Sequence, residues 1–149
     1  MLRSAIAIVV GFVYIGALSF GADALLRSVA PDAFGADGRM HGTGMHLLVI
    51  GYVALFAISG CYLAARIAPI HPMRHALFLG LLGMIVNIMG TIAMWDTAPA
   101  WFHVVSLLLV LPYAYVGGRL REMELARGGP PAIVGVGAGA SAPRAGSRL

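Results

Sequence analysis

The sequence is poor in cysteine and in charged side chains. Its single cysteine, Cys61, allows no internal disulfide bond and excludes a redox mechanism that needs two cysteines. Only 11% of the 149 residues are charged, whereas 60% are hydrophobic and the mean hydropathy is +0.88. A soluble domain of this length needs a larger charged surface, so the composition predicts one integral membrane domain.

Lysine is absent, so all ten basic residues are arginine, and the net charge is +4. A basic chain can bind nucleic acid, but most of these arginines stand beside apolar runs, where membrane topology accounts for them. We therefore expect no nucleic-acid partner. The expected partners are membrane lipids and either a second copy of the chain or a larger membrane complex.

Enzyme motifs are absent as well. The sequence contains no HExxH metal motif, no nucleophile elbow and no Ser, His and Asp set at a recognisable spacing. Motifs thus give no evidence for catalysis and predict no cofactor, although an active site without a motif stays open.

Four apolar runs are long enough to cross a membrane, at about residues 4–23, 45–66, 74–95 and 100–118. The first could instead be a secretory signal, but its run of about 18 apolar residues exceeds the usual 7–15 and favours an uncleaved span. Pro72 suits the first position of the third helix, and Pro112 should bend the fourth. The sequence predicts an all-α membrane protein, a four-transmembrane-helix bundle within residues 1–120.

Residues 121–149 are expected to lie outside the membrane. The charged segment 119–127 (RLREMELAR) can continue the fourth helix for two turns. The remainder, residues 128–149, is rich in Gly, Ala, Pro and Ser, a composition that predicts a disordered tail.

Arginine placement predicts the orientation. Cytoplasmic loops of membrane proteins carry an excess of Lys and Arg. Four antiparallel spans place the N-terminus, the second connection and the tail on one side of the membrane. That side holds eight arginines: Arg3, Arg66, Arg74, Arg119, Arg121, Arg127, Arg144 and Arg148. The opposite side holds only Arg27 and Arg39. Both termini are therefore expected in the cytoplasm, most simply that of a bacterium with the protein in its inner membrane.

The third run carries its small and polar residues on one face. Gly80, Gly83, Asn87 and Gly90 follow one another at steps of three, four and three, which keeps them on one side of a helix. In lipid, small residues mark the face where another helix comes close, and a buried amide can hydrogen-bond across that contact. The spacing predicts a helix-packing seam.

The fourth run has a similar face, made of His103, Ser106, Val110, Tyr113 and Gly117. His103 is the one ionisable group deep enough in a span to serve transport or a proton relay, although the neighbouring Trp101 places it near the interface. Of the other polar candidates inside the spans, Tyr14 and Asn87 fall within about 5 Å of the midplane. Away from the span ends, the membrane interior contains no Asp, Glu or Arg to couple ions to a substrate, which argues against an ion-coupled transporter.

Histidine and aspartate side chains occur at the outer ends of the spans. Antiparallel spans could bring Asp23, His46, Asp96 and His103 to a similar depth, and such nitrogen and oxygen ligands suit zinc. No two of them lie at a motif-like spacing, so we expect ordinary polar span ends and no metal.

Three segments of the chain carry a family resemblance. The segment 60–67 (GCYLAARI), and the segments 99–102 (PAWF) and 111–120 (LPYAYVGGRL), resemble a pattern in many small bacterial four-span proteins. The resemblance covers roughly residues 1–121. That family is described only as hypothetical membrane proteins, so the resemblance implies an architecture and no functional residues.

Three functions remain open. The first is a structural or accessory membrane protein without catalysis. The second is a transporter or channel for a small solute, which at four helices would need an oligomer to enclose a pathway. The third is a membrane enzyme that uses the outer His and Asp groups. A solid bundle packed on glycine would favour the structural or accessory protein. A cavity that reaches the midplane would favour the transporter or channel, and convergent His and Asp side chains would favour the enzyme.

Overall fold

The structure is a computed structural model that describes residues 2–36, 38–68 and 70–127. Four long helices make up most of it: α1 (Leu2–Val29), α2 (Thr43–Ile67), α3 (Pro72–Ala93) and α4 (Ala100–Arg127). Two short 3-10 helices, η1 (Pro31–Ala33) and η2 (Trp95–Thr97), lie in the connections. Each long helix is apolar and long enough to cross a membrane. The predicted all-α architecture of four potential spans is confirmed, while the tail 128–149 lies outside the described residues.

The helix α1 is longer than predicted. It ends at Val29, beyond the predicted span of about residues 4–23, so Asp23 lies inside the helix. The residues after Asp23 include Leu25 and Leu26, which favour a helix. Pro31 is the first residue that forbids its continuation, because a proline disfavours helical geometry in the residue before it.

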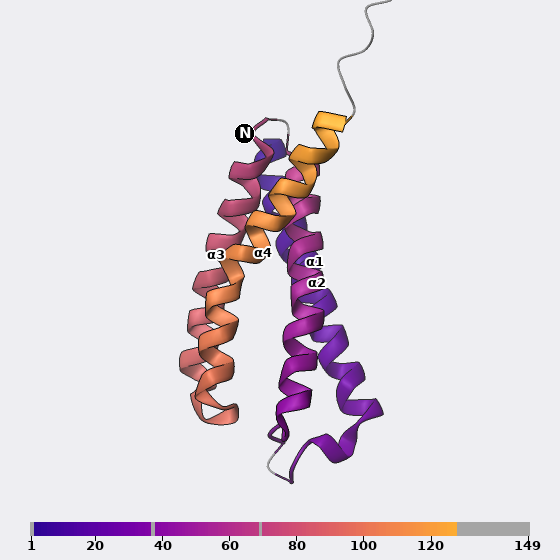
Figure 1. Ribbon diagram of the computed structural model, residues 1–149, viewed down its shortest axis with the longest axis vertical. Coiled ribbons are helices and arrows are strands. Elements are labelled where there is room, and N and C mark those ends of the chain that lie inside the picture. The colour runs from indigo at the N-terminus through magenta and orange to yellow at the C-terminus, as the bar shows by residue number, and fades with distance from the viewer. Residues whose placement is uncertain (1, 37, 69, 128–149) are drawn as a thin grey trace, which may run out of the picture.

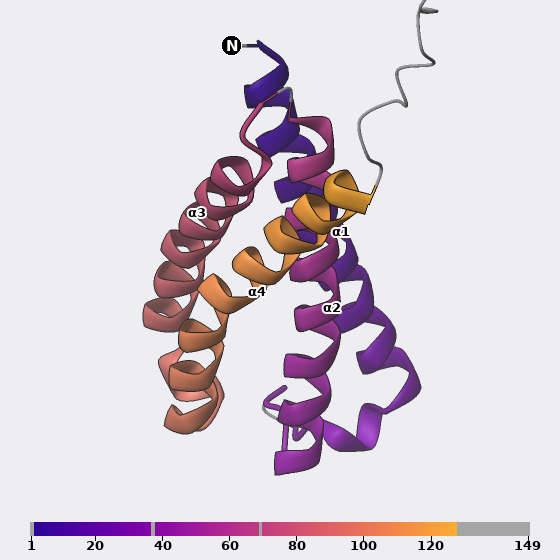
Figure 2. The same cartoon turned by 45° about the horizontal axis from the view of Figure 1, so that its top comes forward.

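Proline also shapes the other helices. The helix α3 begins at Pro72, the predicted position, where the missing N–H group has no helical partner to lose. Pro112 lies inside α4, and this helix changes direction partway along its length (Figures 1 and 2). Beyond the bend, α4 packs against α2 at Gly117 and against the start of α3 at Gly118.

The helices form two pairs that meet at one end of the molecule and diverge at the other (Figure 1). The pair α1 and α2 and the pair α3 and α4 are each in extensive contact, and α4 joins them by its contact with α2. We call the end where α1 begins and α4 ends the closed end, and the end that holds both 3-10 helices the open end.

Small residues hold the closed end together. A buried cluster of mostly small side chains contains Cys61, Ala64, Ala65, Ala76, Leu79 and Ala114. At Gly117 on α4, a Cβ atom would lie 2.6 Å from the Ile58 carbonyl oxygen and 2.9 Å from the Tyr62 nitrogen of α2. At Gly11 on α1, it would lie 3.0 Å from the Gly60 carbonyl oxygen. Because lipid supplies no hydrophobic drive between helices, such backbone contacts stabilise the bundle by dispersion.

Candidate functional site: a cavity between the helix pairs

A cavity of about 400 Å³ lies where the two helix pairs diverge. It extends from η2 and Ala98 at the open end to Cys61 and Leu79, where the small-residue cluster closes it. Proteins bind small molecules in cavities of about 300–1,000 Å³, so this one has the size of a ligand site.

The face of α3 predicted to be a packing seam lines this cavity. Gly80 does make a close contact, since a Cβ there would collide with that of Ala114 on α4. At Gly83, however, the nearest neighbour would be Val110 Cγ1 at 3.9 Å, and at Gly90 nothing lies within 4 Å. Within this chain the seam is tightly packed at Gly80, in ordinary van der Waals reach of α4 at Gly83, and open at Gly90. Spacing identifies the residues that share a face, but it does not tell whether that face meets a helix or a void.

The contacts between α3 and α4 fix their register. Gly80 faces Ala114 and Gly83 faces Val110 in this antiparallel pair. At about 1.5 Å per residue, the next level toward the open end pairs Asn87 with Ser106, about 6 Å further along. All of these residues except Ala114 line the cavity.

One level further toward the open end, Thr91 and His103 lie at matching depth and also line the cavity. The Thr91 hydroxyl is 3.5 Å from the side-chain oxygen of Asn87. Thr91 was missed in the sequence, although its position four residues after Asn87 puts it on the same helical face.

His103 is a buried polar side chain with a fixed ring. Its Nε2 atom lies 3.2 Å from the Trp95 carbonyl oxygen, and its ring stacks on that of Trp95 with centroids 5.2 Å apart. A carbonyl oxygen only accepts, so Nε2 carries a proton, and in the neutral ring Nδ1 is then an acceptor. Among the described residues His103 makes no other hydrogen bond, which leaves Nδ1 available on a side chain that lines the cavity.

The two walls of the cavity differ in polarity. The wall from α2 is apolar and consists of Val49, Ile50, Val53, Ala57 and Cys61. The wall from α3 and α4 carries the amide, hydroxyl and imidazole groups. None of the described lining residues is Asp, Glu, Lys or Arg. A charge buried without a partner is strongly unfavourable, so the arrangement suits an uncharged molecule.

The other predicted polar residues lie apart from the cavity. Tyr14 is half-buried on α1 and is not a lining residue, and Asp96 is exposed in η2. The Asp23 carboxylate accepts a hydrogen bond from the Tyr52 hydroxyl. His46 is buried, but its ring packs on that of Phe102 with centroids 5.1 Å apart.

The outer His and Asp side chains therefore do not converge. His46 Nδ1 bonds the Gly42 carbonyl oxygen at 2.9 Å, and its Nε2 is buried without a partner within the described ranges. In the part of the chain that the structure describes, no three His, Cys, Asp or Glu side chains are placed to hold a metal ion. Among the described residues, these side chains therefore give the enzyme hypothesis no metal site.

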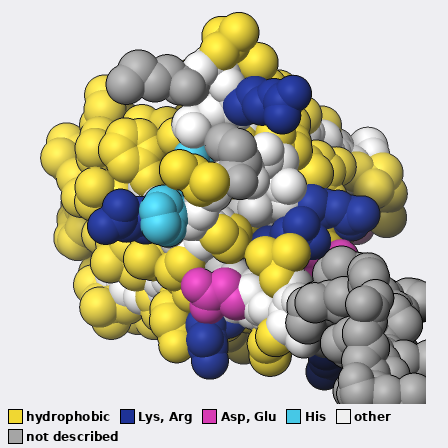
Figure 3. Space-filling view, turned by 90° about the horizontal axis from the view of Figure 1, so that it is seen from above, with side chains coloured by type: hydrophobic (Ala, Val, Ile, Leu, Met, Phe, Trp, Pro, Cys, Tyr) yellow, Lys and Arg dark blue, Asp and Glu magenta, His cyan; other side chains and the backbone are white. Residues whose placement is uncertain are grey.

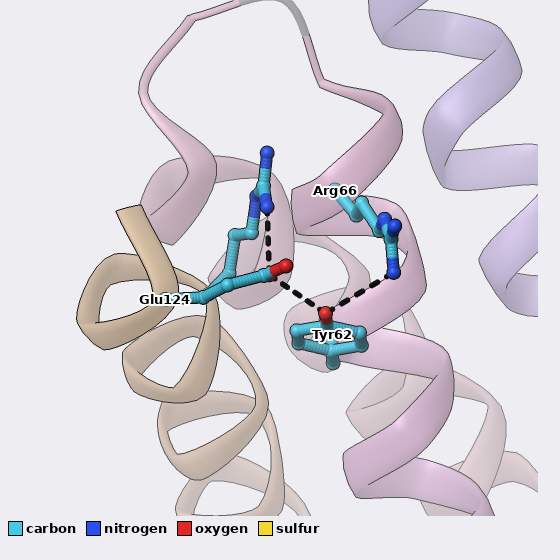
Figure 4. A network of polar contacts seen from close by, with 4 residues as sticks. Tyr62, Arg66 and Glu124 are labelled. Carbon is cyan, nitrogen blue, oxygen red and sulfur yellow. Dashed lines mark hydrogen bonds and ion pairs between the residues drawn. The ribbon is translucent and has the colours of Figure 1, made fainter. Parts of the chain in front are cut away.

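A polar network ties α4 to α2 at the closed end (Figure 4). The Tyr62 hydroxyl donates to Glu124 at 2.7 Å, and Arg121 donates to the same carboxylate oxygen at 2.6 Å. The Arg66 guanidinium lies 3.4 Å from the Tyr62 hydroxyl. The hydrogen bonds from Tyr62 and Arg121 hold the pKa of Glu124 below its ordinary value. The network strengthens the contact that closes this end of the cavity.

No protein-family model matches the chain, and neither does any curated protein or solved structure. The resemblance to small bacterial four-span proteins stays a prediction. The geometry of the cavity and the chemistry of its lining residues are therefore what indicates a function.

Proposed function

We propose that the protein binds a small, uncharged and mostly apolar molecule inside the membrane. This would be the binding step of the second function considered above, a transporter for a small solute. The observation that carries the proposal is the cavity of about 400 Å³, which is closed at one end and has one apolar and one hydrogen-bonding wall. Apolar sites with a few placed polar groups are the usual form of small-molecule sites.

The cavity also weighs against a purely structural role. A bundle whose only task is to pack would fill the face at Gly90, because an empty contact forfeits dispersion energy. A space of about 400 Å³ suits a small-molecule occupant.

The arginine distribution supports an orientation for this site. Arginines gather at the closed end, as the dark blue side chains of Figure 3 illustrate. Among the described residues they are Arg3, Arg66, Arg74, Arg119, Arg121 and Arg127, whereas Arg27 and Arg39 belong to the open end. By the excess of positive charge, the closed end and both termini would face the cytoplasm, and the cavity would open to the outer side of a bacterial inner membrane.

Cysteine accessibility tests the proposal. In a Cys61→Ala background, Ser106→Cys places a thiol in the cavity, and Leu108→Cys places one on a side chain that is 68% exposed on the outside of the bundle. A membrane-impermeant thiol reagent added from outside should label the first variant and not the second, because lipid excludes the reagent. Labelling of both at the same rate, or of neither, would contradict an outward-opening cavity.

A further inference from the structure

The two walls of the cavity constrain the class of ligand. We infer that the ligand is an uncharged single-chain amphiphile with a hydroxyl head group, a conclusion that rests on the proposed function. Its head would lie near Asn87, His103 and Ser106, and its chain would run along α2 toward Cys61.

The head group is identified by hydrogen-bonding capacity. His103 Nδ1 is an acceptor, because Nε2 donates to Trp95, and it can take the proton of a hydroxyl group. Asn87 and Ser106 lie one level deeper and can both donate and accept, so the hydroxyl oxygen also finds donors. An anionic or cationic head would meet no counter-charge among the lining residues.

The chain is identified by the shape and volume of the space. From the level of His103 to that of Tyr113, α4 spans ten residues, roughly 15 Å of depth. At roughly 30 Å³ per non-hydrogen atom, the volume of a water molecule in the liquid, about 400 Å³ holds about 13 atoms. That number of atoms corresponds to one medium-length alkyl chain with a hydroxyl group.

The test uses the full chain in lipid nanodiscs and a diazirine derivative of 1-decanol. After photolysis, peptide mapping should place the label on α2 residues such as Val53 and on α3 near Gly83. Unlabelled 1-decanol should reduce this labelling about fivefold more effectively than decane at the same mole fraction in the bilayer, as expected for one added hydrogen bond. Decyltrimethylammonium should compete about tenfold less well than 1-decanol, or worse.

Two variants examine the head-group contacts. His103→Phe keeps a ring beside Trp95 but removes Nδ1, and Ser106→Ala removes a hydroxyl without adding bulk. Each should reduce the advantage of 1-decanol over decane, whereas Val104→Ala, at a side chain that is 50% exposed, should not. The milder Ser106→Ala keeps the test decisive if His103→Phe does not fold.

The outcomes separate the two claims. Label in the cavity with equal competition by 1-decanol and decane would overturn the hydroxyl head group and leave the proposed binding function standing. Label spread over the lipid-facing surfaces, with none in the cavity, would overturn both.

Discussion

Replacing Gly117 with alanine tests the packing that closes the cavity. A Cβ atom at this position would lie 2.6 Å from the Ile58 carbonyl oxygen, 2.7 Å from Cys61 Cβ and 2.9 Å from the Tyr62 nitrogen. Two of these three neighbours are backbone atoms, which cannot move aside by a change of rotamer. The helices α2 and α4 would have to separate.

The expected magnitude follows from two opposing effects. Overpacking of a close contact costs about 1–3 kcal/mol. Alanine also favours a helix over glycine by roughly 1 kcal/mol, a gain unrelated to packing. Gly51 provides the matched control, because it lies inside α2 with nothing within 4 Å of its Cβ position. Gly117→Ala should therefore be less stable than Gly51→Ala by about 1–3 kcal/mol.

Unfolding of the two variants and the unchanged protein in mixed micelles, followed by circular dichroism over a denaturing-detergent titration, gives this difference. If the variants at Gly117 and Gly51 were equally stable, α2 and α4 would not be in backbone contact. The account of how the cavity is closed would then have to be abandoned.

Three further predictions concern the cavity, the closed end and the orientation. Gly83→Leu should leave stability nearly unchanged but abolish photolabelling by the decanol derivative, because its side chain enters the cavity instead of a helix contact; a loss of stability as large as at a packed glycine would contradict this. The folded-state pKa of Glu124 is lowered, so its stabilising effect should be present above the ordinary value of 4.5 and fade as the pH falls through the folded-state pKa. In unfolding titrations, both Glu124→Gln and Tyr62→Phe should weaken this acid dependence of stability. An unaltered acid dependence in both variants would refute the network's role. A reporter fused after Arg127 should be cytoplasmic and one inserted near Gly38 external, and finding both on the same side would refute the four-span topology.

Much of the fold could be predicted because it depends on local properties of the sequence. Run length and composition identify four helices, and proline positions explain the start of α3 and the end of α1. The predicted first span ends near Asp23, short of the helix end at Val29. A single charged residue does not stop a helix, whereas Pro31 does.

The sequence predicted several residues of the candidate site, but not that they line a cavity. The two faces found from their spacing, with Asn87 on α3 and His103 and Ser106 on α4, do come together. Whether these faces enclose a cavity depends on where the helix pairs diverge. That point is set by contacts elsewhere in the chain, such as the contact of Gly117 with α2. No pattern within one helix contains this information. For the same reason the sequence did not reveal that His46 and Asp23 lie apart from the cavity.

The most direct test of the central claim is a profile of thiol-labelling rates along α4 in the Cys61→Ala background. Single cysteines would replace, in turn, the cavity-lining residues His103, Ser106, Val110 and Tyr113 and the outward-facing residues Val104, Leu108, Leu111 and Tyr115. The account predicts fast labelling from outside at the first four positions, slower with depth, and little at the other four. A profile without helical periodicity, or one with its maxima at the outward-facing positions, would contradict the presence of a cavity between the helix pairs.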